Sequence, residues 1–186
     1  MRYVMVALGL ALLLALVPAV GAQPGLPLLV SVKYIGGSTN TVTVSGTTVP
    51  GTVVSVKGAT KVVDRTGKFS LKSPLPISLV AVKDKHIRRL TINLPSGATK
   101  WLSWLTVNAN LTQMKTTVAG ALTIKDHPSA SVIVEHVEAD KIVQAAVTQG
   151  KFSLGFPLVP RINTLNWTLR YGFLSWNAPR LTFTVQ

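Results

Sequence analysis

Cysteine is absent from this chain of 186 residues. No disulfide can therefore stabilise the fold, and no thiolate can bind a metal ion. Histidine occurs at only three positions, and the sequence has neither a glycine-rich phosphate loop nor the turn that presents a catalytic serine. The common sequence signatures of enzymes are thus missing, and we expect no catalytic activity, no cofactor and no metal site.

Acidic side chains are also scarce. Six Asp and Glu residues are outnumbered by nineteen Lys and Arg residues, which gives a formal net charge of +13 at pH 7. A surface of this sign attracts polyanions such as acidic glycans. The basic residues are spread along the chain, and the export signal described next argues against nucleic acid as a partner.

Only one long apolar run is present, over residues 4–20. It follows Arg2 and ends in the small residues Gly21 and Ala22, which is typical of a secretory signal peptide cleaved after Ala22. The alternative is a retained anchor, because the run is only slightly shorter than the roughly 20 residues of a spanning helix. We expect a helical signal peptide at 1–22, no stable transmembrane anchor after cleavage, and a secreted or cell-surface location.

Beyond Gln23 the sequence is rich in Val and Thr, and Gly, Pro, Asn and Asp separate short alternating segments. This pattern predicts an all-β fold of short antiparallel strands. Seven strands are expected in a first unit, at 28–35, 41–48, 52–57, 61–64, 68–71, 78–83 and 89–94. Seven more are expected in a second unit, at 105–111, 115–124, 131–137, 141–147, 151–154, 165–171 and 180–185.

The two units carry the same landmarks in the same order, which indicates an internal duplication. The sequence Gly-Lys-Phe-Ser-Leu occurs at 67–71 and again at 150–154, and the small-residue triplet at 44–46 matches that at 118–120. The sequence offset grows from 74 at the triplets to 83 at the pentapeptides. The second unit therefore has longer loops, as strand connections tolerate.

The repeated pentapeptide has a structural interpretation. Gly67 supplies the positive φ of a hairpin turn, and the alternation of a strand then directs Phe69 and Leu71 inward and Lys68 and Ser70 outward. The same holds for the second copy. A ligand site that uses the lysine of each copy is the alternative.

The first unit resembles the bacterial immunoglobulin-like ("Big"-type) repeat domains of prokaryotic extracellular proteins. The likeness rests on the Val-Ser-Gly triplet at 44–46, the Thr-Val-Pro-Gly turn at 48–51 and the Gly-Lys-Phe that follows a hairpin. It implies two tandem immunoglobulin-like β-sandwich domains, at 23–97 and 98–186. Carboxypeptidase-regulatory-like and transthyretin-like sandwiches would leave similar traces, and such motifs specify a fold and no activity.

The last predicted hairpin of the second unit is the leading candidate for a ligand-binding site. In immunoglobulin-like topology it lies at the same end of the sandwich as the loop around His127. Both regions are lengthened in the second unit, and Tyr, Trp and Arg are favoured contact residues. The candidate residues are Arg170, Tyr171, Phe173, Trp176, Asn177 and His127. The alternative is that these aromatic side chains cover the end of the core.

Two charged clusters are weaker candidates. Lys83, Lys85, Arg88 and Arg89 form a basic patch at the last hairpin of the first unit, either as a solvated turn or as a contact for acidic glycan or a neighbouring subunit. Acidic and histidine residues gather at 126–127 and 135–140. On a continuous strand His136, Glu138 and Asp140 would share one face and could hold a cation, but a solvated strand edge and turn is the expected outcome.

Two tryptophans between the units and two glycosylation sequons complete the candidate residues. Trp101 and Trp104 lie between the units, where two indoles are expected to bury an interface. Asn110 and Asn166 begin Asn-x-Thr sequons and are candidates for glycosylation.

These features together predict an exported, non-enzymatic protein with a structural or adhesive role at the cell surface. A sharper hypothesis is a self-assembling filament subunit, in which segment 23–35 adds a strand to a neighbour's sheet. The alternative is an accessory glycan- or protein-binding module that uses the enlarged loops of the second unit. The expected partners are other cell-surface proteins, acidic glycans or further copies of the chain.

Overall fold

The computed structural model describes residues 25–35, 41–93, 102–123 and 130–186, which form fourteen strands and one short 3-10 helix. The first unit consists of β1 (Leu28–Ile35), β2 (Thr41–Thr48), β3 (Val53–Val56), β4 (Ala59–Val62), β5 (Lys68–Pro74), β6 (Ile77–Lys83) and β7 (His86–Asn93). The second consists of β8 (Leu102–Asn110), β9 (Lys115–Leu122), β10 (Ser131–His136), η2 (Val137–Ala139), β11 (Lys141–Ala146), β12 (Lys151–Pro157), β13 (Arg161–Tyr171) and β14 (Leu174–Val185). The all-β prediction is confirmed, and every predicted strand overlaps an observed one.

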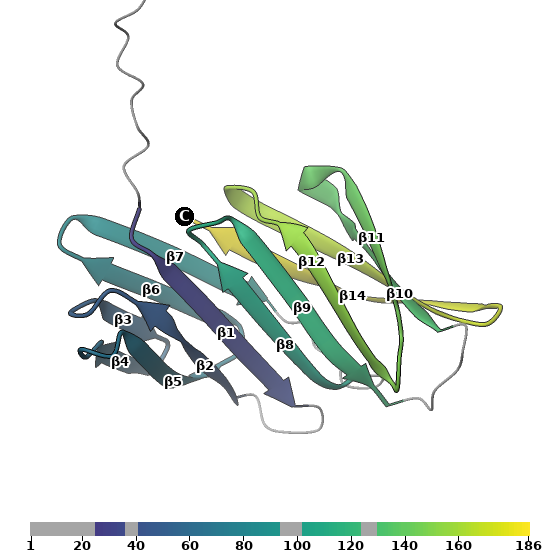
Figure 1. Cartoon of the computed structure of the whole chain (residues 1–186), viewed down its shortest axis with the longest axis horizontal. Coiled ribbons are helices and arrows are strands. Elements are labelled where there is room, and N and C mark those ends of the chain that lie inside the picture. Colours follow the sequence, from purple (N-terminus) through teal and green to yellow (C-terminus); the bar gives the residue numbers. More distant parts are fainter. Residues whose placement is uncertain (1–24, 36–40, 94–101, 124–129) are drawn as a thin grey trace, which may run out of the picture.

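The strands form two sheets that pack face to face, as Figure 1 shows. The six-stranded sheet has the order β12-β9-β8-β1-β2-β5, and the eight-stranded sheet has the order β11-β10-β13-β14-β7-β6-β3-β4. All the pairings between these strands are antiparallel. The molecule is therefore a β-sandwich.

The duplication is visible in the strand order of each half. In the first unit, β5-β2-β1 lies in one sheet and β4-β3-β6-β7 in the other. The second unit repeats this arrangement as β12-β9-β8 and β11-β10-β13-β14. Each strand of the first unit thus has the same neighbours within its unit as its counterpart has in the second unit.

Both sheets run without interruption through the two units. Strand β1 pairs antiparallel with its counterpart β8, and β7 pairs antiparallel with its counterpart β14. Pairing each strand antiparallel with its own counterpart relates the units by an approximate two-fold rotation, as in an isologous dimer. Two separate sandwiches in series are therefore not confirmed, because the units are halves of one sandwich. Their predicted boundary at 97 and 98 lies outside the described residues.

A single hydrophobic core fills the space between the sheets and extends through both units. The core forms because successive side chains of a strand point to opposite faces of the sheet. In β1, for example, Leu28, Val30 and Val32 are buried, whereas Leu29 and Lys33 are exposed. In the second unit the rings of Phe152 and Trp167 meet edge to face, with centroids 6.0 Å apart. Trp167 is therefore a core residue.

The repeated pentapeptide has the structural role that the sequence predicted. Gly67 and Gly150 have φ angles of +71° and +70°, and Phe69 and Phe152 are buried. Each phenylalanine faces a glycine of the adjacent strand, Gly46 in the first unit and Gly120 in the second. The two sequence landmarks of each unit are thus cross-strand partners.

The junction tryptophans differ in how far the structure describes them. Trp101 lies outside the described residues. Trp104 is half-buried in β8, opposite Ile35 of the first unit on one side and Ala121 on the other. It therefore lies in the six-stranded sheet, where the two units join.

Candidate functional site

The β13–β14 hairpin projects beyond the neighbouring strands at one end of the sandwich (Figure 1). Its strands have 11 and 12 residues, whereas their counterparts β6 and β7 have 7 and 8. Strand β7 pairs only with the far part of β14, from Thr182 to Val185. The hairpin near residues 171–174 therefore extends past β7.

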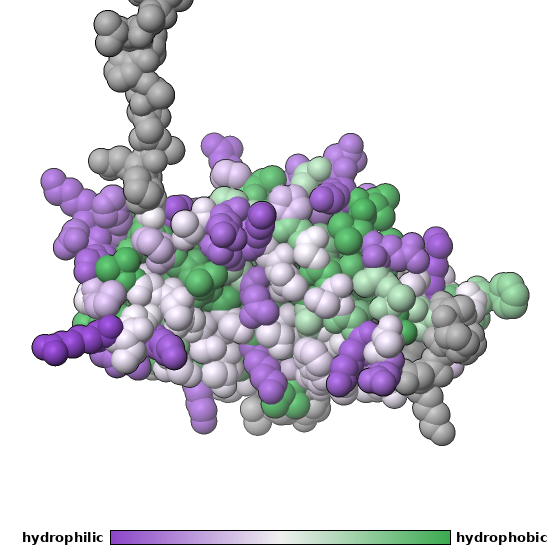
Figure 2. Space-filling model, viewed as in Figure 1, coloured by the Kyte–Doolittle hydropathy of each residue, from purple (hydrophilic) through white to green (hydrophobic). Residues whose placement is uncertain are grey.

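The tip of this hairpin is apolar and exposed. Tyr171 pairs with Leu174 across a two-residue turn in which Gly172 has a φ of +60°. The exposed fraction is 108% for Phe173 and 57% for Leu174. In Figure 2 hydrophobic atoms project at the end of the molecule that Figure 1 assigns to this hairpin. We call Tyr171, Phe173 and Leu174 the hairpin tip.

The structure describes only some of the sequence candidates at this hairpin. Arg170 and Phe173 are exposed, and Tyr171 is half-buried. The side chains of Trp176 and Asn177 and the whole of His127 lie outside the described residues. Ser131, which begins β10 four residues after His127 in the sequence, pairs with Arg170. Leu174 lies in the same predicted hairpin loop but was absent from the predicted set, because leucine is not among the favoured contact residues.

The basic patch is divided between structural and exposed side chains. The ammonium group of Lys83 donates a hydrogen bond to the carbonyl oxygen of Pro50, and Arg88 Nε donates one of 3.4 Å to the carbonyl oxygen of Leu26. Lys85 and Arg89 are exposed. Two of the four predicted residues, Lys83 and Arg88, thus donate hydrogen bonds to backbone carbonyl groups of other segments.

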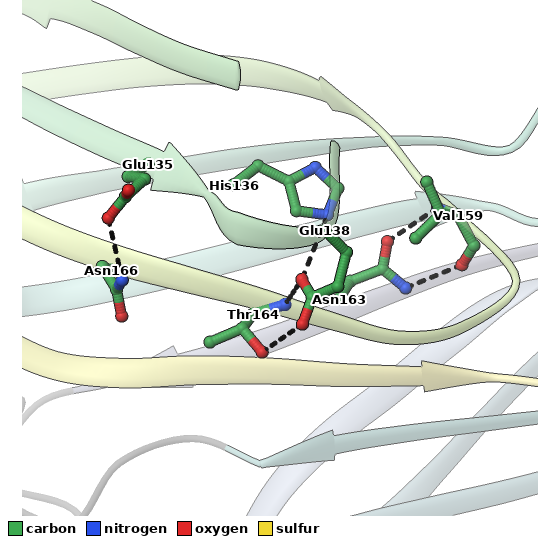
Figure 3. Close-up of polar contacts among 7 residues, drawn as sticks. All are labelled: Glu135, His136, Glu138, Val159, Asn163, Thr164 and Asn166. Carbon is green, nitrogen blue, oxygen red and sulfur yellow. Dashed lines mark hydrogen bonds and ion pairs between the residues drawn. The ribbon is translucent and has the colours of Figure 1, made fainter. Parts of the chain in front are cut away.

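A second polar cluster surrounds the end of β10 (Figure 3). His136 is fully buried, and neither of its ring nitrogens has a hydrogen-bond partner among the described residues. Its Nε2 lies 3.7 Å from Glu138 Oε2. Glu138 accepts hydrogen bonds from the backbone N–H of Thr164 and, at 2.6 Å, from the Thr164 hydroxyl. The expectation of a solvated edge was wrong for His136, because β10 directs its ring into the sandwich.

The electrostatics of this cluster follow from its burial. Burial lowers the pKa of His136 below its ordinary value of 6.5, although the Glu138 carboxylate acts in the opposite direction. Burial also raises the pKa of Glu138, but the hydrogen bonds from Thr164 outweigh it and leave that pKa below its ordinary value. At neutral pH the pair therefore consists of a neutral imidazole beside a carboxylate.

The predicted face of His136, Glu138 and Asp140 does not form. Strand β10 ends at His136, the chain turns through η2, and Asp140 has a φ of +47°. Within the described ranges no group of three or more His, Asp or Glu side chains is placed to hold a metal ion. The cluster is instead a link between η2 and β13.

Asn163 adds a buried polar contact next to this link. Its amide group donates to the carbonyl oxygen of Val159 at 2.8 Å and accepts from the Val159 N–H at 2.7 Å (Figure 3). Asn163 is fully buried. It fixes the turn that leads into β13, the first strand of the projecting hairpin.

Both sequon asparagines make hydrogen bonds. Asn110 Oδ1 accepts from the N–H groups of Thr112 and Gln113, at 3.0 and 2.9 Å. Asn166 Nδ2, the atom to which a glycan would be attached, donates to Glu135 Oε2 at 2.9 Å. Modification of Asn166 would replace one of the two hydrogens on this nitrogen and leave one N–H for the contact with Glu135.

No family model matches the chain, and no curated protein sequence is significantly similar to it. The likeness to bacterial immunoglobulin-like repeats therefore stays a prediction. Helices of the length and apolarity that a membrane span requires are not found among the described residues.

Proposed function

We propose that this protein is an exported, non-enzymatic adhesion protein that contacts a partner on a cell surface through its hairpin tip. The observation that carries the proposal is the hairpin tip, in which Phe173 and Leu174 are exposed and Tyr171 is half-buried, on a hairpin that extends beyond its neighbours. Aromatic side chains supply much of the energy of protein contacts. Two paired strands support the tip, so that little ordering is needed on binding.

We further propose that each unit is immunoglobulin-like. The order β1-β2-β5 in one sheet and β3-β6-β7 in the other corresponds to the A-B-E and C-F-G order of that fold. Strand β4, which extends the second sheet beside β3, takes the place of the additional strand of variable-type domains. Loops at the ends of such sandwiches commonly carry binding, which agrees with a contact at the β13–β14 turn.

Export is proposed from the apolar segment at 4–20 and the small residues before Gln23. Its test is the mass of the protein recovered from the medium or the cell surface. A chain that begins at Gln23 supports cleavage after Ala22, whereas an intact Met1 contradicts it.

Filament assembly by strand exchange would require a larger rearrangement. Within its own chain β1 is paired on both edges, with β2 and with β8. Donation of this strand to another copy would break both ladders. A contact through the hairpin tip leaves the sandwich intact.

The proposed contact is tested by the share of protein retained on the cells that secrete it. F173S/L174S should reduce the retained fraction several-fold and leave the melting temperature unchanged, because both side chains are exposed. The matched control is V62S/I142S, which alters two aliphatic side chains that are 64% and 70% exposed at other places. Equal retention of both variants and the unmodified protein would rule out the hairpin tip as the contact.

A further inference from the structure

The outer face of the six-stranded sheet has an unusual charge composition. Every one of its strands except β2 and β8 contributes an exposed lysine; these residues are Lys33, Lys68, Lys72, Lys115 and Lys151. None of the described residues in the six strands is Asp or Glu. Figure 2 views this face, on which purple hydrophilic side chains lie among pale, weakly hydrophilic ones.

The described acidic residues lie elsewhere. Asp64 and Asp84 are in turns of the first unit, Glu135 is in the eight-stranded sheet, and Glu138 and Asp140 are in and after η2. The lysines of the six-stranded sheet thus have no carboxylate within their own sheet to neutralise them. An anion that approaches the described strands of this face meets charge of one sign only.

The register of the sheet aligns small polar side chains in a row across the strands. We call this set the polar row, and it consists of Ser70, Ser45, Ser31, Asn108 and Thr117, each opposite the next. Five strands at the usual spacing of about 4.8 Å give the row a length of roughly 19 Å. Hydroxyl and amide groups of this kind both donate and accept hydrogen bonds.

Lysines flank the polar row on both sides. On one side Lys72 and Lys33 stand in line with Thr43 and Thr106. On the other side Lys68 and Lys115 stand in line with Thr47, Leu29 and Asn110. Each flanking line is two residues along the strands from the polar row, or about 7 Å. The polar row therefore lies between two lines of residues that contain the lysines.

A groove of about 450 Å³ follows part of the polar row. Its lining comes from both units and combines the aliphatic residues Leu29, Val30 and Ala109 with the polar residues Ser31, Thr47, Asn108, Asn110, Gln113, Lys115 and Thr117. Ser31 of β1 lies opposite Asn108 of β8, at the junction of the two halves. The groove therefore exists only because the sheets of the two units are continuous.

We propose that this face binds a linear acidic polysaccharide, which lies along the polar row with its anionic groups at the flanking lysines. Sugar hydroxyls exchange hydrogen bonds with Ser31, Asn108 and Thr117, and carboxylate or sulfate groups pair with Lys33, Lys72 and Lys115. This site is separate from the hairpin tip and does not depend on it. Either site can fail its test while the other stands.

The composition of the face favours a polysaccharide over a lipid surface or a nucleic acid. Membrane-binding faces present a broad apolar surface, whereas the exposed aliphatic residues of these described strands are Leu29 and Ile35. Proteins that bind single-stranded nucleic acid stack bases on several aromatic side chains. Among the described residues on the outer face of this sheet, one side chain is aromatic. It is Trp104, which is half-buried, so the described part of this face lacks the several aromatic side chains that base stacking needs.

The experiment measures affinity of the purified protein for polygalacturonate, a carboxylated polymer, and for dextran sulfate, a sulfated one. Neutral dextran is the uncharged reference. We expect binding to at least one acidic polymer that weakens as ionic strength rises from about 0.01 to 0.15 M. K33Q/K72Q/K115Q should lower the affinity by about tenfold, since each exposed ion pair contributes modestly.

Matched variants separate a defined site from net charge. K57Q/R65Q/K141Q removes the same charge from exposed positions outside this sheet and should retain nearly the full affinity. N108D places a carboxylate in the centre of the polar row and should weaken binding, whereas N93D adds the same charge to β7 and should not. All the substituted side chains in these variants are exposed, so their melting temperatures should match that of the parent.

Three outcomes would overturn the proposal. The first is an equal loss of affinity in the two triple variants. The second is no binding to either acidic polymer at low ionic strength. The third is tighter binding to phosphatidylglycerol vesicles or to single-stranded DNA than to both acidic polymers, with K33Q/K72Q/K115Q weakening that binding instead.

Discussion

The ring of Phe69 in β5 occupies the space that a side chain at Gly46 in β2 would need. A Cβ atom at Gly46 would lie 2.6 Å from Phe69 Cζ and 2.0 Å from the carbonyl oxygen of Leu29. The second unit repeats the relationship, since a Cβ atom at Gly120 would lie 2.7 Å from Phe152 Cζ. The glycine and the phenylalanine are therefore one packing unit, present once in each half.

Gly46→Ala should destabilise the protein by about 1–3 kcal/mol, because the new methyl group overlaps a ring and a backbone oxygen. Gly120→Ala should cost less, since the nearest backbone oxygen, that of Trp104, would be 3.0 Å away. Urea unfolding measures both. Gly155→Ala is the control: its nearest atom would be 3.9 Å away, so its free energy of unfolding should change little. A G46A protein as stable as G155A would contradict the packing role of the glycine.

The strands could be predicted from sequence because their signals are local. Alternation and turn residues within a few positions define β1 and β2, and the turn glycines Gly67 and Gly150 have the positive φ that was expected. The pairing of Gly46 with Phe69 spans 23 positions, the difference between their residue numbers, and leaves no local trace. Both were recognised as repeated landmarks, but their contact was not foreseen.

The union of the two units could not be read from the sequence for the same reason. The edge of a strand is free or paired depending on tertiary context, and the alternation in β1 and β8 is the same in either case. Two sandwiches in series and one joined sandwich have the same strand pattern. The polar row is consequently invisible in the sequence, since it draws on strands of both units.

The environment of His136 was missed because local sequence does not reveal burial at the end of a strand. The acidic neighbours Glu135, Glu138 and Asp140 indicated solvent, yet the ring lies inside the sandwich. The sequence singled out the segment that contains the hairpin tip because its aromatic residues Tyr171 and Phe173 lie two positions apart. Its exposure was one of two alternatives, and the structure places Phe173 in solvent.

Stability should fall as the pH drops below 6.5. The pKa of His136 is lower in the folded protein than in the unfolded chain, so the unfolded chain binds the proton first as the pH falls. The stability is complete above the unfolded pKa and decreases by up to about 1.4 kcal/mol per pH unit toward the folded pKa. Glu138 adds a second loss below its ordinary value of 4.5, because its folded pKa is also lowered.

Urea unfolding between pH 7 and pH 5 measures the first of these losses. His136→Leu should flatten the dependence in this range, since the substitution removes the buried titrating group. His86→Leu, which removes an exposed histidine, is the matched control. An unchanged slope in H136L would assign the effect to another group.

Asn163→Ala should destabilise the fold by about 1–3 kcal/mol, because it leaves the N–H and carbonyl groups of Val159 without their partner. Asn163→Asp should be worse near neutral pH, since a buried carboxylate can accept from the N–H but cannot donate to the carbonyl oxygen. Thermal unfolding measures both. Asn93→Ala, at an exposed site, is the control, and an equal melting temperature in all three variants would show that the Val159 turn does not need this side chain.

The first unit expressed alone, as residues 23–97, should form a dimer. Separation from the second unit frees the edge of β1 that pairs with β8 over Leu29–Ile35, and the edge of β7 that pairs with β14. Within the chain each of these strands already pairs antiparallel with its own counterpart, so two copies of one unit can make the same contacts. Unpaired strand edges are otherwise templates for aggregation.

Size-exclusion chromatography with light scattering distinguishes these states. Addition of the second unit, residues 98–186, should replace the dimer with a one-to-one complex, because the natural pairing includes the contacts that Arg89 makes with Gln186 in both directions. A first unit that stays a folded monomer, with the melting temperature of the full chain, would show that the β1–β8 and β7–β14 ladders contribute little. The two halves would then be independent domains that merely lie edge to edge.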